Sequence, residues 1–165
     1  MTADQKRLDD LLRWLDPPRG GLWHGGPHVL TVTRGIRAED AAWRPAPGRH
    51  TIWELVLHLA YWKYAVRNRI EAGPRGTFPR KPSDWPSQPD RADEKVWKSD
   101  LALLKTEHNA TLALVRGFDA ARLDELWGGA EQWSYMDLLS GIVLHDTYHV
   151  AQIQLIKRLR ASAAS

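Results

Sequence analysis

Apolar residues recur at helical spacing in four segments of this 165-residue chain, and this pattern constrains the fold more than any other feature. The segments run from about 4 to 15, 51 to 72, 92 to 116 and 134 to 160. The sequence has no sustained alternation of apolar and polar residues, which a half-buried strand requires. We therefore predict an all-α fold, an antiparallel four-helix bundle that forms a single domain over residues 1–165.

Prolines and capping residues mark the ends of these helices. The first helix ends at Asp16, because the proline that follows disfavours helical geometry in the residue before it. A short helical piece around 28–33 is expected to complete this first arm of the bundle. Thr51 and Glu54 fit a capping box, in which each side chain bonds the other residue's free backbone amide. Asp137 is placed for a second, weaker box at the start of the last helix.

The connection over residues 73–92 is unusually long. It holds five of the ten prolines, at positions 74, 79, 82, 86 and 89. Connections inside a compact domain typically have only ~4–6 residues. Two interpretations remain open: a Pro-rich surface crossover of fixed shape, or a segment that acts as a lid or as a dimer contact.

Composition excludes several kinds of site. The chain has no cysteine, which rules out disulfides, thiolate ligands, Fe–S clusters and a cysteine nucleophile, so any metal must have nitrogen and oxygen ligands. The net charge of +3 is spread along the sequence, and we expect no nucleic-acid partner. No signal peptide is apparent, and no apolar stretch approaches the ~20 residues that span a bilayer. We therefore expect a soluble cytoplasmic protein with no membrane contact.

Two histidines lie on one face of the last predicted helix. Steps of four and three residues place six side chains on this face: Leu138, Ile142, His145, His149, Gln152 and Ile156. Histidines four apart can chelate one metal ion. The residue after His145 is Asp146 rather than the glutamate of a zincin, which excludes a metalloprotease. The alternative is a core or surface pair, but imidazoles among leucine and isoleucine cost free energy unless their nitrogens find partners.

His58 is the candidate for a third ligand. It follows Leu55 by three residues and precedes Trp62 by four, so it borders the buried face of the second main helix. A metal ion held by three histidines would keep one or more positions for water or substrate. The alternative for His58 alone is a core histidine that bonds a backbone carbonyl.

Two further residues are candidate helpers in catalysis. Glu54 lies four residues before His58, where it could accept a proton from the imidazole, reach the metal or simply cap the helix. Gln152 follows His149 by three residues and is placed to orient a bound water. The remaining histidines lie outside the apolar stripes and are expected at the surface or in loops: His24, His28, His50 and His108.

The order of these motifs resembles that of the DinB/YfiT-like superfamily. The resemblance rests on the approach WRPAPGRHTI over 43–52, the histidine segment IWELVLHL over 52–59, and HDTYHVAQI over 145–153. It covers roughly residues 4 to 160. The short first helix departs from the family pattern, which affects the shape expected at the mouth of the pocket.

The resemblance implies a four-helix bundle with a divalent metal ion bound by His58, His145 and His149. It also implies a homodimer, and a small-molecule substrate whose reaction uses a low-molecular-weight thiol. Zinc or nickel is expected foremost, and iron and manganese also fit, since imidazole ligands do not discriminate sharply. We therefore expect a metal-dependent enzyme, a thiol-using transferase or a hydrolase. The alternative is a non-catalytic bundle in which the metal stabilises the core or a bound small molecule.

Overall fold

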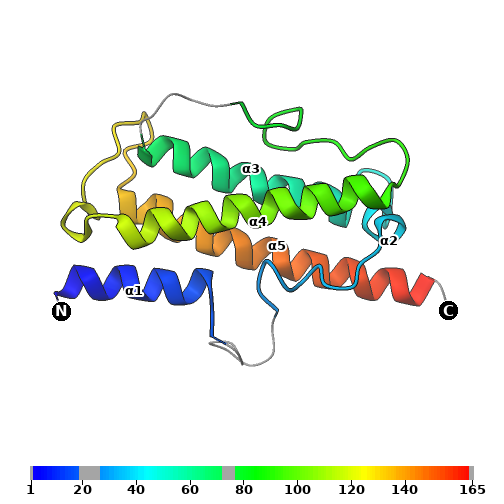
Figure 1. The fold of residues 1–165 in the computed structure, drawn as a ribbon, viewed down its shortest axis with the longest axis horizontal. Helices are drawn as coiled ribbons and strands as arrows, with labels where there is room; N and C mark the ends of the chain where they lie inside the picture. The colour runs from blue at the N-terminus through cyan, green and yellow to red at the C-terminus, as the bar shows by residue number, and fades with distance from the viewer. Residues whose placement is uncertain (1, 19–26, 72–76, 164–165) are drawn as a thin grey trace.

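The computed structural model describes residues 2–18, 27–71 and 77–163. Its helices are α1 (Ala3–Leu15), α2 (Ala38–Ala42), α3 (Ile52–Glu71), α4 (Glu94–Gly117) and α5 (Tyr135–Ala163), with a short 3-10 helix η1 at Ala120–Arg122. Over the described ranges, β structure is limited to one isolated bridge between Leu126 and Ser134. The predicted all-α four-helix bundle is confirmed, with α1, α3, α4 and α5 as its main helices (Figure 1). No helix in the described part is long and apolar enough to cross a membrane.

Helices α3 and α4 lie side by side and run in the same direction. Near their N-terminal ends, Trp53 Nε1 donates a hydrogen bond to Asp100 at 2.8 Å. Further along both helices, Arg67 donates to Glu107 at 3.0 Å. Figure 1 shows α1 and α5 running opposite to this pair. The bundle is therefore antiparallel between α3 and α5, whereas α3 and α4 are parallel.

The parallel pair explains the long connection after α3. Since α3 has 20 residues, it is ~30 Å long, and the chain must return over that distance before α4 begins. Residues 77–93 follow this path outside α3 (Figure 1). Residues 73–76 of the predicted connector lie outside the described residues.

Both predicted capping boxes form. Thr51 Oγ1 accepts from the Glu54 amide, and Glu54 Oε2 accepts from the Thr51 amide, each at 3.1 Å. Ser134 and Asp137 make the same reciprocal pair of bonds at the start of α5, at 3.1 and 2.8 Å. These local bonds fix the first turns of the two helices that carry the candidate ligands.

The segment between α1 and α3 completes the first arm without the helical piece predicted around 28–33. Residues 29–35 form turns that end at Gly35, whose φ of 76° is a left-handed conformation that glycine adopts readily. The arm is held to α5 by Lys157 Nζ, which donates to the Val32 carbonyl at 3.1 Å, and by the Arg160–Asp40 ion pair at 3.0 Å. It covers the part of α5 that the 13-residue α1 does not reach (Figure 1).

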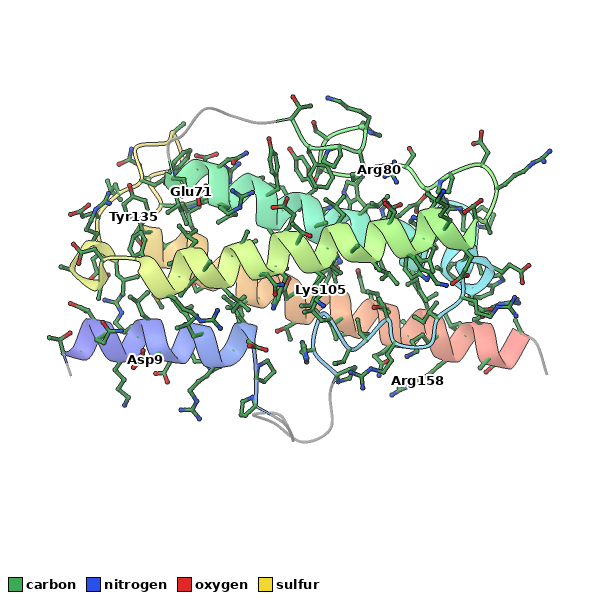
Figure 2. All side chains as sticks on the ribbon, in the orientation of Figure 1. Asp9, Glu71, Arg80, Lys105, Tyr135 and Arg158 are labelled. Carbon is green, nitrogen blue, oxygen red and sulfur yellow. The ribbon has the colours of Figure 1, made fainter. Side chains whose placement is uncertain are left out.

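Side chains fill the space between the helices (Figure 2). The core has two apolar clusters, with a layer of buried polar residues between the helices. In this layer Lys63 is fully buried and donates to Asp146 Oδ2 at 2.5 Å. Arg67 and Glu107 form a second ion pair at 3.0 Å. The buried charges are thus paired across helices, as their desolvation requires.

His108 also lies in the polar layer, and the prediction of a surface or loop position for it was wrong. The residue is 0% exposed, and across the described part of the chain neither of its ring nitrogens has a hydrogen-bond partner. It lies on the inner face of α4 together with Leu104 and Thr111, which are also buried. Periodicity of apolar residues does not identify a buried position when the residue there is polar, which is why the prediction failed. Burial, reinforced by the charge of Lys63, lowers the pKa of His108 to about 3.

The same surface or loop position was predicted for three other histidines. His28 and His50 lie in connecting segments, as predicted, and His24 lies outside the described residues.

The burial of His108 predicts a pH-dependent stability. The folded protein keeps this ring neutral, whereas the unfolded chain binds a proton below the ordinary histidine pKa of ~6.5, so stability falls as the pH drops from there toward the folded pKa. We expect His108→Leu to lower the slope of the free energy of unfolding against pH by up to ~1.4 kcal/mol per pH unit between about pH 6 and 4. Urea unfolding of the wild type and of the variant at several pH values in this range measures the two slopes. Identical slopes would contradict the neutral buried state of His108.

Candidate metal centre

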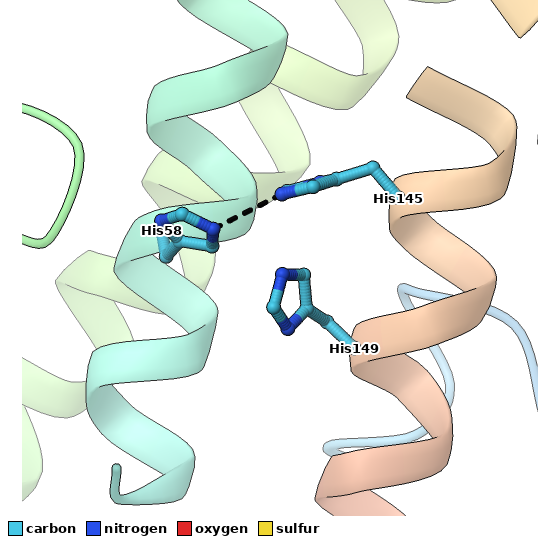
Figure 3. A group of neighbouring side chains, drawn as sticks. All are labelled: His58, His145 and His149. Atoms are coloured by element: carbon cyan, nitrogen blue, oxygen red, sulfur yellow. Dashed lines mark hydrogen bonds between the residues drawn. The ribbon is translucent and has the colours of Figure 1, made fainter. Parts of the chain in front are cut away.

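Three imidazoles converge between α3 and α5. His58 projects from α3 and His145 and His149 from consecutive turns of α5, toward one another (Figure 3). One ring nitrogen from each lies within 4.8 Å of the other two, and His58 Nε2 is 3.0 Å from His145 Nε2. His58 is 5% exposed and His149 4%. The structure therefore brings together the three histidines singled out in the sequence, in a group that can hold a metal ion.

The crossover fixes the orientation of His58. The His58 Nδ1–H donates to the Asp84 carbonyl at 2.6 Å, which leaves the Nε2 lone pair facing the other two rings. Asp84 has a left-handed backbone with φ 68°, which aspartate tolerates better than most residues. Its side chain accepts from Trp62 Nε1 at 2.7 Å, so α3 anchors the loop residue that orients its own histidine.

Trp85 covers the outer face of His58. Its ring stacks on His58 with centroids 3.7 Å apart and an interplanar angle of 9°. On its other side Trp85 stacks on His50 at 3.6 Å and 8°. The sequence pattern did not predict a site role for Asp84, Trp85 or His50. The one available signal was a tryptophan within a Pro-rich connection, and periodicity cannot place a residue that lies outside a helix.

Gln152 orients His149. Its Oε1 accepts from the His149 Nδ1–H at 2.7 Å, so the Nε2 of His149 carries the available lone pair. Such a partner fixes the tautomer and the ring orientation of a metal-binding histidine. The structure thus gives Gln152 a contact with an imidazole, where the sequence suggested contact with a bound water.

His145 is the third member and the least constrained. Within the described residues its buried Nδ1 has no hydrogen-bond partner, and its Nε2 points at His58 Nε2. Two nitrogen lone pairs 3.0 Å apart repel unless a proton or a cation lies between them. A cation bound by both lone pairs relieves this repulsion, and nitrogen separations of about 3–4 Å suit an ion ~2.0–2.1 Å from each ligand. The 3.0 Å separation of the His58 and His145 nitrogens meets this condition, and His149 supplies a third nitrogen within 4.8 Å, so the donor set fits a divalent metal ion.

Burial keeps the three rings neutral. It lowers the pKa of His58 to about 4 and that of His145 to about 3, and it also lowers the pKa of His149. The neighbouring imidazoles reinforce the shifts of His58 and His145. Neutral imidazole is the form that binds a metal, so all three rings have lone pairs available at neutral pH.

Glu54 lies apart from this group. Its carboxylate pairs with Arg44 at 2.5 Å, with His50 at 3.2 Å and with the Thr51 amide. Although burial opposes ionisation, these bonds lower the pKa of Glu54, with the Arg44 guanidinium contributing most. No hydrogen bond joins it to any of the three imidazoles. The potential metal-binding group found among the described residues contains histidines alone.

The fold and the site define a helical bundle with a three-histidine group that can hold a metal ion. Comparison with known families agrees, because the model of the DinB superfamily matches residues 27–153, well over half of the chain. The chain therefore belongs to the DinB superfamily. No curated protein and no solved structure gave a significant match.

The stacking of Trp85 predicts a measurable change at His58. Trp85→Ala exposes the ring, and we expect the pKa of His58 in the metal-free protein to rise from about 4 toward the ordinary histidine value of ~6.5. NMR titration of the imidazole resonances measures the shift. Trp133→Ala, at a half-exposed tryptophan without a ring contact to His58, serves as the control. An unchanged pKa in Trp85→Ala would contradict the covering role.

Proposed function

We propose that His58, His145 and His149 bind a divalent metal ion and that the protein is a metal-dependent enzyme. The supporting observation is the convergence of three neutral imidazoles, two of them on buried residues, with the Nδ1 protons of His58 and His149 already engaged. A divalent ion held in this way supplies Lewis-acid chemistry, since it acidifies a water or thiol that takes an open position. Zinc and nickel are the ions we expect foremost, and iron and manganese are compatible.

Other residues of the protein position the histidine rings that would bind the metal. Asp84 and Gln152 hold two ligand rings in place, and Trp85 keeps water from the outer face of His58. We propose a small-molecule substrate and a transferase reaction that uses a low-molecular-weight thiol, or else a hydrolase reaction. Since the chain has no cysteine, a thiol nucleophile would have to come from such a second small molecule.

Elemental analysis tests the metal centre. Untagged protein should carry close to one divalent ion per chain, and His145→Ala should lose it, because two remaining imidazoles hold an ion much less tightly. His28→Ala removes a histidine from a connecting segment and should retain the metal. Metal-free wild-type protein with native folding and full thermal stability would overturn the proposal.

Gln152 gives a sharper prediction. Gln152→Leu removes the acceptor of the His149 Nδ1–H and should weaken metal binding by roughly 10–100-fold. Gln154→Leu, the same substitution two residues further along α5, is the matched control and should change the affinity little. Competition with a chromophoric chelator measures both. Equal affinities in the two variants would contradict the orienting role.

Turnover assays separate an enzyme from a binding protein. A screen of thiol-transfer and hydrolysis reactions should detect metal-dependent turnover that His149→Ala abolishes. If chelation lowers the melting temperature but no assay shows turnover above the rate without protein, the metal stabilises a non-catalytic binding protein instead.

We also propose a homodimer formed through α5. Large apolar side chains at helical spacing are exposed on one face of this helix: Leu144 (69%), Tyr148 (62%), Leu155 (55%) and Leu159 (44%). A contiguous exposed apolar face of this kind marks an interaction surface. A second copy of the chain suits it, because the same stripe then packs on itself about a two-fold axis.

Light scattering tests the dimer. The double variant Leu144→Glu, Leu155→Glu should be monomeric, because it places charges in the centre of the stripe. Leu126→Glu changes an equally exposed leucine outside α5 and should leave the mass unchanged. A monomeric wild-type protein would contradict the proposal.

A further inference from the structure

A pocket of about 350 Å³ extends from the histidine group along the space between α3 and α5. His145 lines it at one end and Arg69 lies among its α3 residues. Apolar side chains from both helices form its walls: Trp62, Val66, Leu138 and Ile142. The pocket thus joins the three-histidine group to a surface that is mostly apolar and has one cation.

The order of the lining residues follows from the antiparallel packing of α3 and α5. The Trp62 ring lies beside His145, with centroids 6.1 Å apart. Arg69 is seven residues further along α3, so its backbone is ~10 Å from that of Trp62. On α5, Gly141 lines the pocket with no side chain, and a Cβ placed there would meet nothing within 4 Å. A medium-sized apolar group therefore has room between His145 and Arg69.

Arg69 is held without a carboxylate. Its guanidinium lies 5.5 Å from the Trp62 ring centroid and 5.6 Å from that of Trp127. In the described ranges it forms no ion pair, whereas Arg67 on the same helix pairs with Glu71 and Glu107. The residues outside those ranges include no aspartate or glutamate. The two indoles fix the cation, and its N–H donors are left for another acceptor.

The one carboxylate that lines the pocket is already engaged. Asp137 accepts from the Ser134 amide at 2.8 Å and from the Ser134 hydroxyl at 2.7 Å. These bonds cap α5, and they lower the pKa of Asp137. Asp137 therefore serves the helix end, and Arg69 is the charged pocket residue whose hydrogen-bond donors are free.

We infer that the substrate is a small organic acid whose carboxylate binds Arg69 while its apolar body lies against Trp62, Leu138 and Ile142. The planar guanidinium matches a carboxylate with two parallel hydrogen bonds, and apolar walls strengthen that attraction by excluding water. The far end of such a molecule would lie at His145. This inference rests on the proposed metal centre for its reaction, but the binding mode depends on the pocket alone.

Calorimetry on metal-free protein tests the binding mode directly. We expect 5-phenylvalerate to bind about tenfold more tightly than the neutral 5-phenylpentanol, because its carboxylate makes charge-assisted hydrogen bonds with Arg69. Arg69→Met should abolish this preference, and Arg69→Lys should keep part of it. Arg116→Met removes the same charge from α4 outside the pocket and should leave the preference intact. Equal binding of the two probes by the wild type, or no saturable binding, would overturn the inference.

A second variant locates the apolar body. Gly141→Leu fills the pocket without changing its charge, so it should weaken both probes severalfold and leave their ratio unchanged. Unaltered affinity for both probes would place the ligand elsewhere and overturn the inference.

Cobalt-loaded protein separates this inference from the proposed function. Titration with 6-mercaptohexanoate and with 6-mercaptohexanol should produce a thiolate-to-metal absorption band, at lower concentration for the carboxylate, with the difference lost in Arg69→Met. If cobalt does not bind but the 5-phenylvalerate preference persists, the metal centre fails and the Arg69 site stands. If cobalt binds and the carboxylate preference survives in Arg69→Met, the metal centre stands and the Arg69 site is overturned.

Discussion

Two neighbouring helices of a bundle that run in the same direction need a connection as long as the helices themselves. In this protein α3 and α4 are that pair, and the returning chain passes outside α3 (Figure 1). The return path brings the Asp84 carbonyl to His58 Nδ1 and places Trp85 on the His58 ring. The topology therefore supplies the groups that orient and cover one of the three histidines, and the geometry of the site depends on it.

A second constraint acts on α5, where two adjacent residues, about 100° apart around the helix axis, have different roles. His145 faces the candidate metal centre, and Asp146 faces the core, where it pairs with the fully buried Lys63. Taking both charges out of water is costly, and the cost is offset only while the pair is intact. A rotation of α5 that broke this pair would also move His145, so the polar layer of the core and the position of the imidazole are coupled.

The space between α3 and α5 combines three kinds of surface in a short distance. Neutral imidazoles lie beside an apolar pocket, and a cation held between indoles lies further along it. The exposed stripe of α5 borders the same region, since the Tyr148 ring is 4.9 Å from that of His149. The proposed dimer would thus place a second copy close to the proposed reaction centre.

The sequence by itself determined the helices, their capping boxes and the face shared by His145 and His149, because periodicity and local hydrogen bonding depend on residues a few positions apart. The resemblance to the family added His58 to that pair. Only the tertiary structure decided the parallel direction of α3 and α4, the burial of His108, and the roles of Asp84 and Trp85. Each of these depends on contacts between distant segments, and a loop residue such as Trp85 has no period from which its position can be predicted.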